Sequence, residues 1–109
     1  MKTIEDMARL SAGIWNHYMA ACVKQPQFAD MVCIRGDGYA MEAESERAVL
    51  QQMAAAGRED IPADLAMDAA LNDIYAACSN GDVELARIRL LDAVAVLLRM
   101  DDMLQEGRA

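Results

Sequence analysis

The stretch NGDVELARIRLLDAVAVLLRMDDML, residues 80–104, decides the fold of this chain. Gly81 predicts a left-handed end for one helix, and Asp82 predicts the N-cap of the next helix. Because so few residues separate the two helices, they must form an antiparallel helical hairpin. The second helix, predicted over residues 83–106, is apolar over more of its circumference than a surface helix needs. We therefore expect other elements to cover it on several sides.

One stripe of this helix is expected to face the rest of the chain, because its apolar residues recur at helical spacing. Its members are Val83, Ala86, Leu90, Ala93, Val94, Leu97 and Leu104.

The composition favours an all-α protein. Among the 109 residues are nine Met, one Trp and one Phe, and Ala and Leu are abundant. These residue types are mostly helix formers, and few β-branched residues compete with them. A chain of this length forms one domain, so we expect a single helical domain over residues 1–109 that folds as a small bundle of four helices.

Local signals place the other helices at residues 4–24, from 39 or 41 to 56, and 62–79. Thr3 and Asp6 indicate a capping box at the first helix, and Pro26 ends that helix. Trp15 and Tyr18 are expected to form the aromatic part of the core. Asp60 is the predicted N-cap of the third helix, with Pro62 in its first turn.

Residues 26–41 allow two interpretations. A short fifth helix from Pro26 to Arg35 is favoured, because no further strand exists to complete a sheet. The alternative is a β-hairpin over residues 31–41, turning at Arg35-Gly36-Asp37-Gly38, where glycines flank an aspartate.

The net charge of −8 limits the choice of partners. Nucleic acids and anionic membranes bind clustered Lys and Arg, so neither is an expected partner. An acidic surface suits solubility or docking on a basic protein. The three cysteines contain no CxxC pair and are expected to be reduced. Without a visible secretory signal or membrane span, we expect a cytoplasmic protein.

The sequence contains no recognisable catalytic, cofactor-binding or metal-binding set. His17 is the only histidine, and it lies roughly 140° from Cys22 around a helix, so the two do not share a face. A catalytic triad needs a histidine with partners, and none is recognisable here. We expect His17 to be exposed. A helical-bundle enzyme or metal-binding protein is therefore the weakest of three hypotheses.

The first hypothesis is a non-enzymatic protein-interaction or regulatory module that forms a homodimer. The surplus apolar surface of the last helix suits a symmetry mate, since twofold interfaces are the commonest oligomeric contact. The predicted contact residues are Leu85, Ile88, Ala95, Met100 and Met103.

The second hypothesis is an acidic inhibitor or nucleic-acid mimic of the kind that phages and mobile elements encode. It requires carboxylates to gather on one face, in the places that phosphates would occupy. The candidate residues are Glu42, Glu44, Glu46, Asp60, Asp64 and Asp68.

Overall fold

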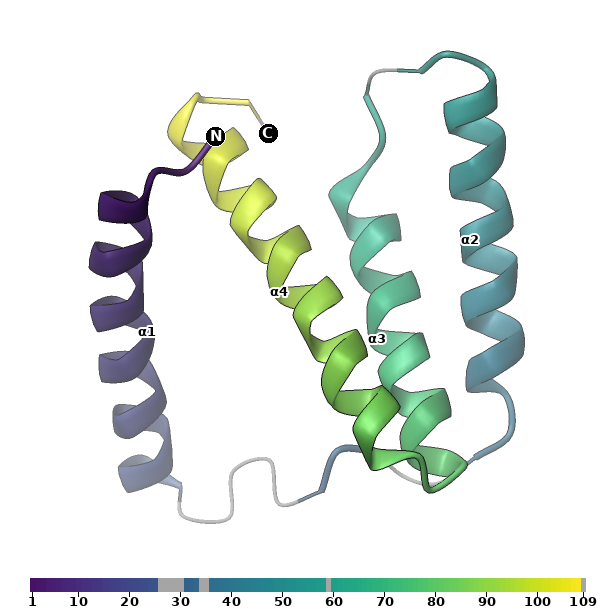
Figure 1. Cartoon of the computed structure of the whole chain (residues 1–109), viewed down its shortest axis with the longest axis horizontal. Coiled ribbons are helices and arrows are strands. Elements are labelled where there is room, and N and C mark those ends of the chain that lie inside the picture. Colours follow the sequence, from purple (N-terminus) through teal and green to yellow (C-terminus); the bar gives the residue numbers. More distant parts are fainter. Residues whose placement is uncertain (26–30, 34–35, 59, 109) are drawn as a thin grey trace. The chain divides into compact units, whose positions relative to one another are not determined.

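The structure, a computed structural model, describes residues 1–25, 31–33, 36–58 and 60–108. Over these residues the chain forms four helices and no strand: α1 (Ile4–Lys24), α2 (Tyr39–Ala55), α3 (Ala63–Ser79) and α4 (Val83–Gln105) (Figure 1). The predicted all-α class and C-terminal helical hairpin are confirmed.

The chain divides into two compact units, Met1–Val32 and Cys33–Ala109. In its described residues the first unit holds one helix, α1, and the second unit holds α2, α3 and α4. The single domain expected over residues 1–109 stays a prediction.

Side-chain and backbone caps set the helix ends. At α1, the Thr3 hydroxyl accepts from the Asp6 N–H (3.1 Å) while the Asp6 carboxylate accepts from the Thr3 N–H (2.9 Å), which is the predicted capping box. At α4, the Asp82 carboxylate accepts from the Leu85 N–H at 3.1 Å, as predicted. These bonds satisfy amides that the first helical turn leaves without a backbone acceptor.

The C-terminal ends of α2, α3 and α4 share one motif. Gly57, Gly81 and Gly107 have positive φ angles of 74°, 75° and 72°. In each case the next N–H reaches back to close the helix; the Asp82 N–H, for example, donates to the Ala77 carbonyl at 2.9 Å. This Schellman geometry favours glycine because it has no Cβ.

Two local predictions are wrong. Asp60 does not cap α3: the N-cap is Pro62, and the Asp60 carboxylate binds Arg58 instead. The hairpin over residues 31–41 does not form, because α2 already begins at Tyr39. The favoured fifth helix is not seen at residues 31–33, which belong to no helix, and its residues 26–30 and 34–35 lie outside the described residues.

In the second unit α3 is the central helix and packs against both α2 and α4. The α2–α3 contact includes the rings of Tyr39 and Tyr75, which are tilted against each other with their centroids 5.2 Å apart. Figure 1 shows α2 and α3 antiparallel, with α4 returning from the short turn after α3. These helices therefore form one layer in which only α3 has a neighbour on each side.

The buried residues of this layer are mostly alanines. Among the described residues, Ile74 is the only large apolar side chain that is buried, at 4% exposed. The buried alanines are Ala43, Ala69, Ala70, Ala77, Ala86 and Ala93. Small side chains allow helix axes to approach closely, but they remove little apolar surface from water. Larger side chains of α3, among them Met67, Leu71 and Tyr75, are only partly buried and pack against the cluster of Ala70, Ile74 and Ala93.

The predicted aromatic core is wrong. Trp15 and Tyr18 contact each other on α1, with ring centroids 6.0 Å apart, but they are 60% and 56% exposed. The aromatic pair of the α2–α3 contact, Tyr39 and Tyr75, comes from residues that the pattern did not group together.

Candidate protein-interaction surface

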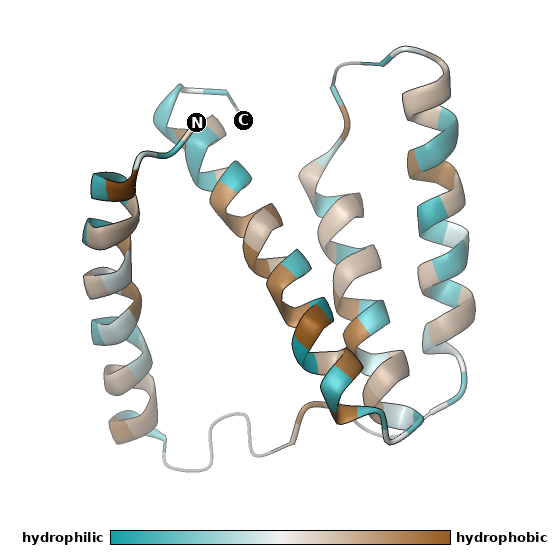
Figure 2. Cartoon of the chain, in the orientation of Figure 1, coloured by the Kyte–Doolittle hydropathy of each residue, from teal (hydrophilic) through white to brown (hydrophobic). Residues whose placement is uncertain are grey.

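The apolar stripe of α4 is divided between core and surface. Ala86 and Ala93 face α3 and are buried, as expected, but the larger residues of the stripe are exposed. Figure 2 shows strongly hydrophobic residues recurring along α4, whereas α2 carries mostly weakly hydrophobic and hydrophilic residues. The expectation that this chain covers the whole stripe is therefore wrong for its larger members.

We call the exposed part of α4 the outer stripe. It follows one side of the helix beside the face that contacts α3, and its side chains are between 40% and 66% exposed. Its members are Val83, Leu90, Leu91, Val94 and Leu97. A group of exposed apolar side chains of this kind, with Arg87 between Val83 and Leu90, is typical of a protein-interaction site, whereas single exposed apolar residues need no explanation.

The contact residues predicted from the sequence fall into two groups. Leu85 and Ile88 are exposed near the beginning of α4, and Ile88 lies opposite Leu97 around the helix, since nine residues correspond to roughly 900° of rotation. Ala95, Met100 and Met103 instead line a cleft toward the other end of α4.

This cleft lies between the N-terminal half of α3, with the segment before it, and the C-terminal half of α4. The axes of α3 and α4 separate with distance from their connecting turn (Figure 1), and the cleft has a volume of about 1020 Å³. Its apolar lining is Ile61, Pro62, Ala63, Ala66, Ala95, Val96, Met100, Met103 and Leu104. A largely apolar concave surface with polar groups at its edge is the usual form of a binding site.

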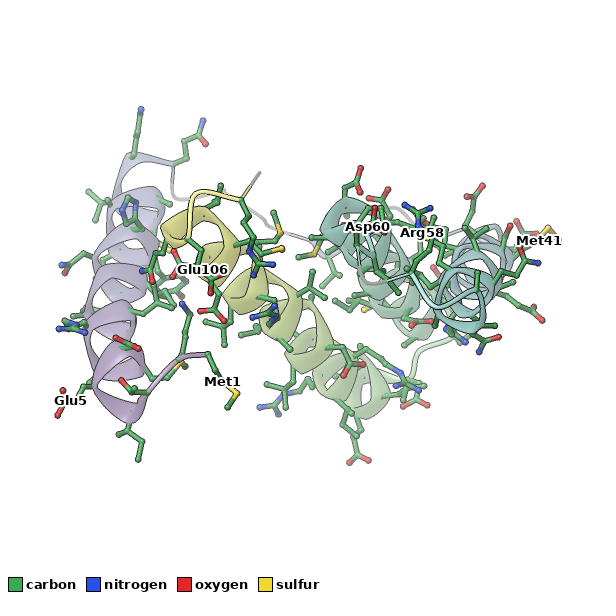
Figure 3. The ribbon with its side chains drawn as sticks, turned by 90° about the horizontal axis from the view of Figure 1, so that it is seen from above. Met1, Glu5, Met41, Arg58, Asp60 and Glu106 are labelled. Atoms are coloured by element: carbon green, nitrogen blue, oxygen red, sulfur yellow. The ribbon has the colours of Figure 1, made fainter. Side chains whose placement is uncertain are left out.

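Most of the charged residues at the edge of the cleft are paired with an opposite charge, whereas the Asp64 carboxylate accepts from the backbone N–H of Leu65. Arg58 donates two hydrogen bonds of 3.0 Å to the Asp60 carboxylate, and Figure 3 shows the two side chains next to each other. This bidentate contact lowers the pKa of Asp60 below its ordinary value. Arg99 pairs with Asp102 at 3.1 Å and Arg108 with Glu106 at 2.6 Å. The edge therefore carries little uncompensated charge, and the apolar walls dominate the cleft.

The six acidic candidates do not gather on one face. Because α2 and α3 are antiparallel, Glu42, Glu44 and Glu46 lie beside the C-terminal half of α3, where Glu46 accepts from Asn72 at 2.6 Å. Asp60, Asp64 and Asp68 belong to the opposite end of the same helix pair. Arg47 also pairs with Asp73 between the two helices. The acidic candidates thus form two separate groups, whereas the nucleic-acid-mimic hypothesis requires a single acidic face.

No group of three or more His, Cys, Asp or Glu side chains suited to a metal ion occurs in the described parts of the chain. Cys22, Cys33 and Cys78 are free thiols, each half-buried. The Cys33 thiol donates weakly to the Tyr75 carbonyl, with a sulfur–oxygen distance of 3.9 Å. His17 is exposed, as predicted.

None of the helices in the described ranges is long and apolar enough to cross a membrane. Comparisons with protein-family models, with curated proteins and with solved structures found no match.

The outer stripe was visible in the sequence as a periodic apolar pattern, but that pattern could not show which of its residues lack a neighbour. The cleft left no signal in the sequence, because it depends on the angle at which α3 and α4 separate.

Proposed function

We propose that the protein is a protein-interaction module that acts as a homodimer, with the outer stripe of α4 forming the twofold contact. The observation that carries this proposal is the exposure of five valine and leucine side chains on one side of α4. Covering them with a partner would contribute about 25 cal/mol of favourable free energy for each Å² of apolar surface removed from water.

The available area suits a modest interface. About half the surface of these five side chains is on the order of 450 Å² per chain, so two copies would bury on the order of 1,000 Å² in total, near the lower limit for specific contacts. We therefore expect a concentration-dependent dimer with a dissociation constant in the micromolar range, that is, about −8 kcal/mol.

Helix packing also supports a pairing of α4 with a second α4. The outer stripe repeats at spacings of three, four and seven residues through positions 83, 90, 94 and 97, which is the pattern that two helices bury between them. A twofold axis brings the same stripe from both copies together, so the contact needs no second complementary surface.

Sedimentation equilibrium of the full chain over about 1–100 μM tests this proposal. The wild-type protein should shift from 11.9 kDa to twice that mass as its concentration rises. Leu97→Glu should remain monomeric, because it places a carboxylate within the twofold contact. Circular dichroism of both proteins should show the same helix content.

Leu85→Glu is the matched control, since Leu85 is 37% exposed on the same helix, opposite Val94 and at least about 120° around the helix from every member of the outer stripe. This variant should dimerise like the wild type. Monomers of wild-type protein at every concentration would refute the proposal. Dissociation by Leu85→Glu and not by Leu97→Glu would transfer the contact to the side of Leu85 and Ile88.

A further inference from the structure

The cleft between α3 and α4 and the apolar side of α1 match each other in size. A helix about 10–12 Å in diameter with a rise of 1.5 Å per residue fills roughly 120–170 Å³ per residue. The cleft volume of about 1020 Å³ therefore accommodates roughly six to nine residues, or about two helical turns. One helix is thus the largest regular element that can enter it.

The α1 helix has an apolar side with no partner helix in the described part of its own unit. Apolar residues recur along it at helical spacing, and polar residues such as Glu5, Arg9 and Asn16 lie on the other side. Its exposed apolar residues on this side are Ile4, Met7, Ile14, Trp15 and Tyr18. Most of the stability of a helix in a protein comes from tertiary packing of its apolar face, so α1 needs a surface that covers this side.

The chemistry of the two surfaces is complementary. Ile14, Trp15 and Tyr18 fall within about two turns of α1, which is the length that the cleft holds. Met100 and Met103 line the cleft, and methionine sulfur makes favourable contacts with aromatic rings. Aromatic side chains are also the usual anchors when a helix docks in an apolar groove.

We propose that the cleft between α3 and α4 binds the α1 helix of a second copy of this chain, with Trp15 and Tyr18 inserted beside Met100 and Met103. The inference rests on the proposed homodimer and names a second contact within it. This contact is separate from the outer stripe, because none of the five outer-stripe residues lines the cleft.

Trp15 is the only tryptophan of the chain, so its fluorescence reports this contact directly. In the full-length protein, Trp15 emission should shift to the blue and acrylamide quenching should decrease as the dimer forms. Ala95→Glu should abolish both changes, because it places a carboxylate in the cleft from an exposed position that the fold tolerates. Met103→Glu is a second variant with the same expected loss.

Met41→Glu is the control. Met41 is 75% exposed on α2, and Figure 3 shows it on the side of α2 that faces away from α3. This variant should keep the blue shift and the weak quenching of the wild type.

Mixing two defective variants identifies the second copy as the source of the helix. Ala95→Glu chains retain Trp15 but have a blocked cleft, whereas Trp15→Glu chains have an open cleft and no tryptophan signal. Adding Trp15→Glu chains to Ala95→Glu chains should restore the blue shift, because the open cleft of one chain receives the α1 of the other. Absence of restoration would overturn the inference, as would Trp15 burial that is independent of wild-type concentration.

The two proposals fail in different ways. A wild-type dimer in sedimentation with fully exposed Trp15 would refute docking of α1 and leave the homodimer intact. A wild-type monomer at every concentration would refute the homodimer. Restoration by variants that also carry Leu97→Glu would support docking of α1 and contradict the outer stripe as the twofold contact.

Discussion

Gly81 makes the turn between α3 and α4 possible. Its φ of +75° lies in the left-handed region, and no atom lies within 4 Å of the position that a Cβ would occupy. Gly81→Ala should therefore lower the free energy of unfolding by about 1–2 kcal/mol through backbone strain alone. Urea denaturation measures this loss, and an unchanged midpoint would show that another conformation replaces the turn.

Gly13 provides the comparison for Gly81. It lies within α1, and a Cβ added there would likewise meet no atom within 4 Å, but its φ is not positive. Gly13→Ala should therefore stabilise α1 by about 1 kcal/mol, which is the ordinary difference in helix propensity between glycine and alanine.

Asp6 makes the stability of the beginning of α1 depend on pH. The Thr3 backbone N–H and the Arg9 guanidinium, 2.7 Å away, lower the pKa of Asp6 from 3.8 to about 2. Because the folded pKa is the lower one, the carboxylate stabilises α1 fully above about pH 4, and this contribution is lost as the pH falls through about 2. Circular dichroism should show helix loss across that window.

Two variants separate the effect of Asp6 from general acid unfolding. Asp6→Asn should reduce the part of the transition that depends on this carboxylate, whereas Glu5→Gln, at the neighbouring exposed position, should leave it unchanged. A carboxyl NMR titration that places the pKa of Asp6 near 3.8 would contradict the capping-box assignment.

The contact between α3 and α4 depends on small side chains. Ala93 is 6% exposed and belongs to one cluster with Ala70 and Ile74. Ala93→Leu should lower the free energy of unfolding by about 1–3 kcal/mol, because the larger side chain forces α3 and α4 apart. Ala54→Leu, at an exposed position of α2, should change it by less than about 0.5 kcal/mol in urea denaturation. Equal effects of both changes would show that the contact is loosely packed.

The proposed homodimer has a consequence for thermal stability. A second copy that binds only folded chains raises the Tm as the protein concentration increases. Wild-type protein and Leu85→Glu should show this dependence in calorimetry, whereas Leu97→Glu should have a constant Tm. A constant Tm for the wild type would argue that the outer stripe has no partner.

The sequence by itself determined the elements of this protein. Thr3, Asp6 and Asp82 cap helices as predicted, and Gly57 and Gly81 end them. These signals act within one turn of the backbone, so local sequence is sufficient to identify them. The all-α class followed for the same reason, since it depends on propensity and period.

Only the tertiary structure decided which apolar residues are covered. Periodicity placed Ala93 and Leu97 on one stripe, but the first is buried and the second is 53% exposed. The physical reason is that burial depends on neighbouring helices and on their crossing angles. In this layer α3 covers one face of α4, while the outer stripe and the walls of the cleft stay open.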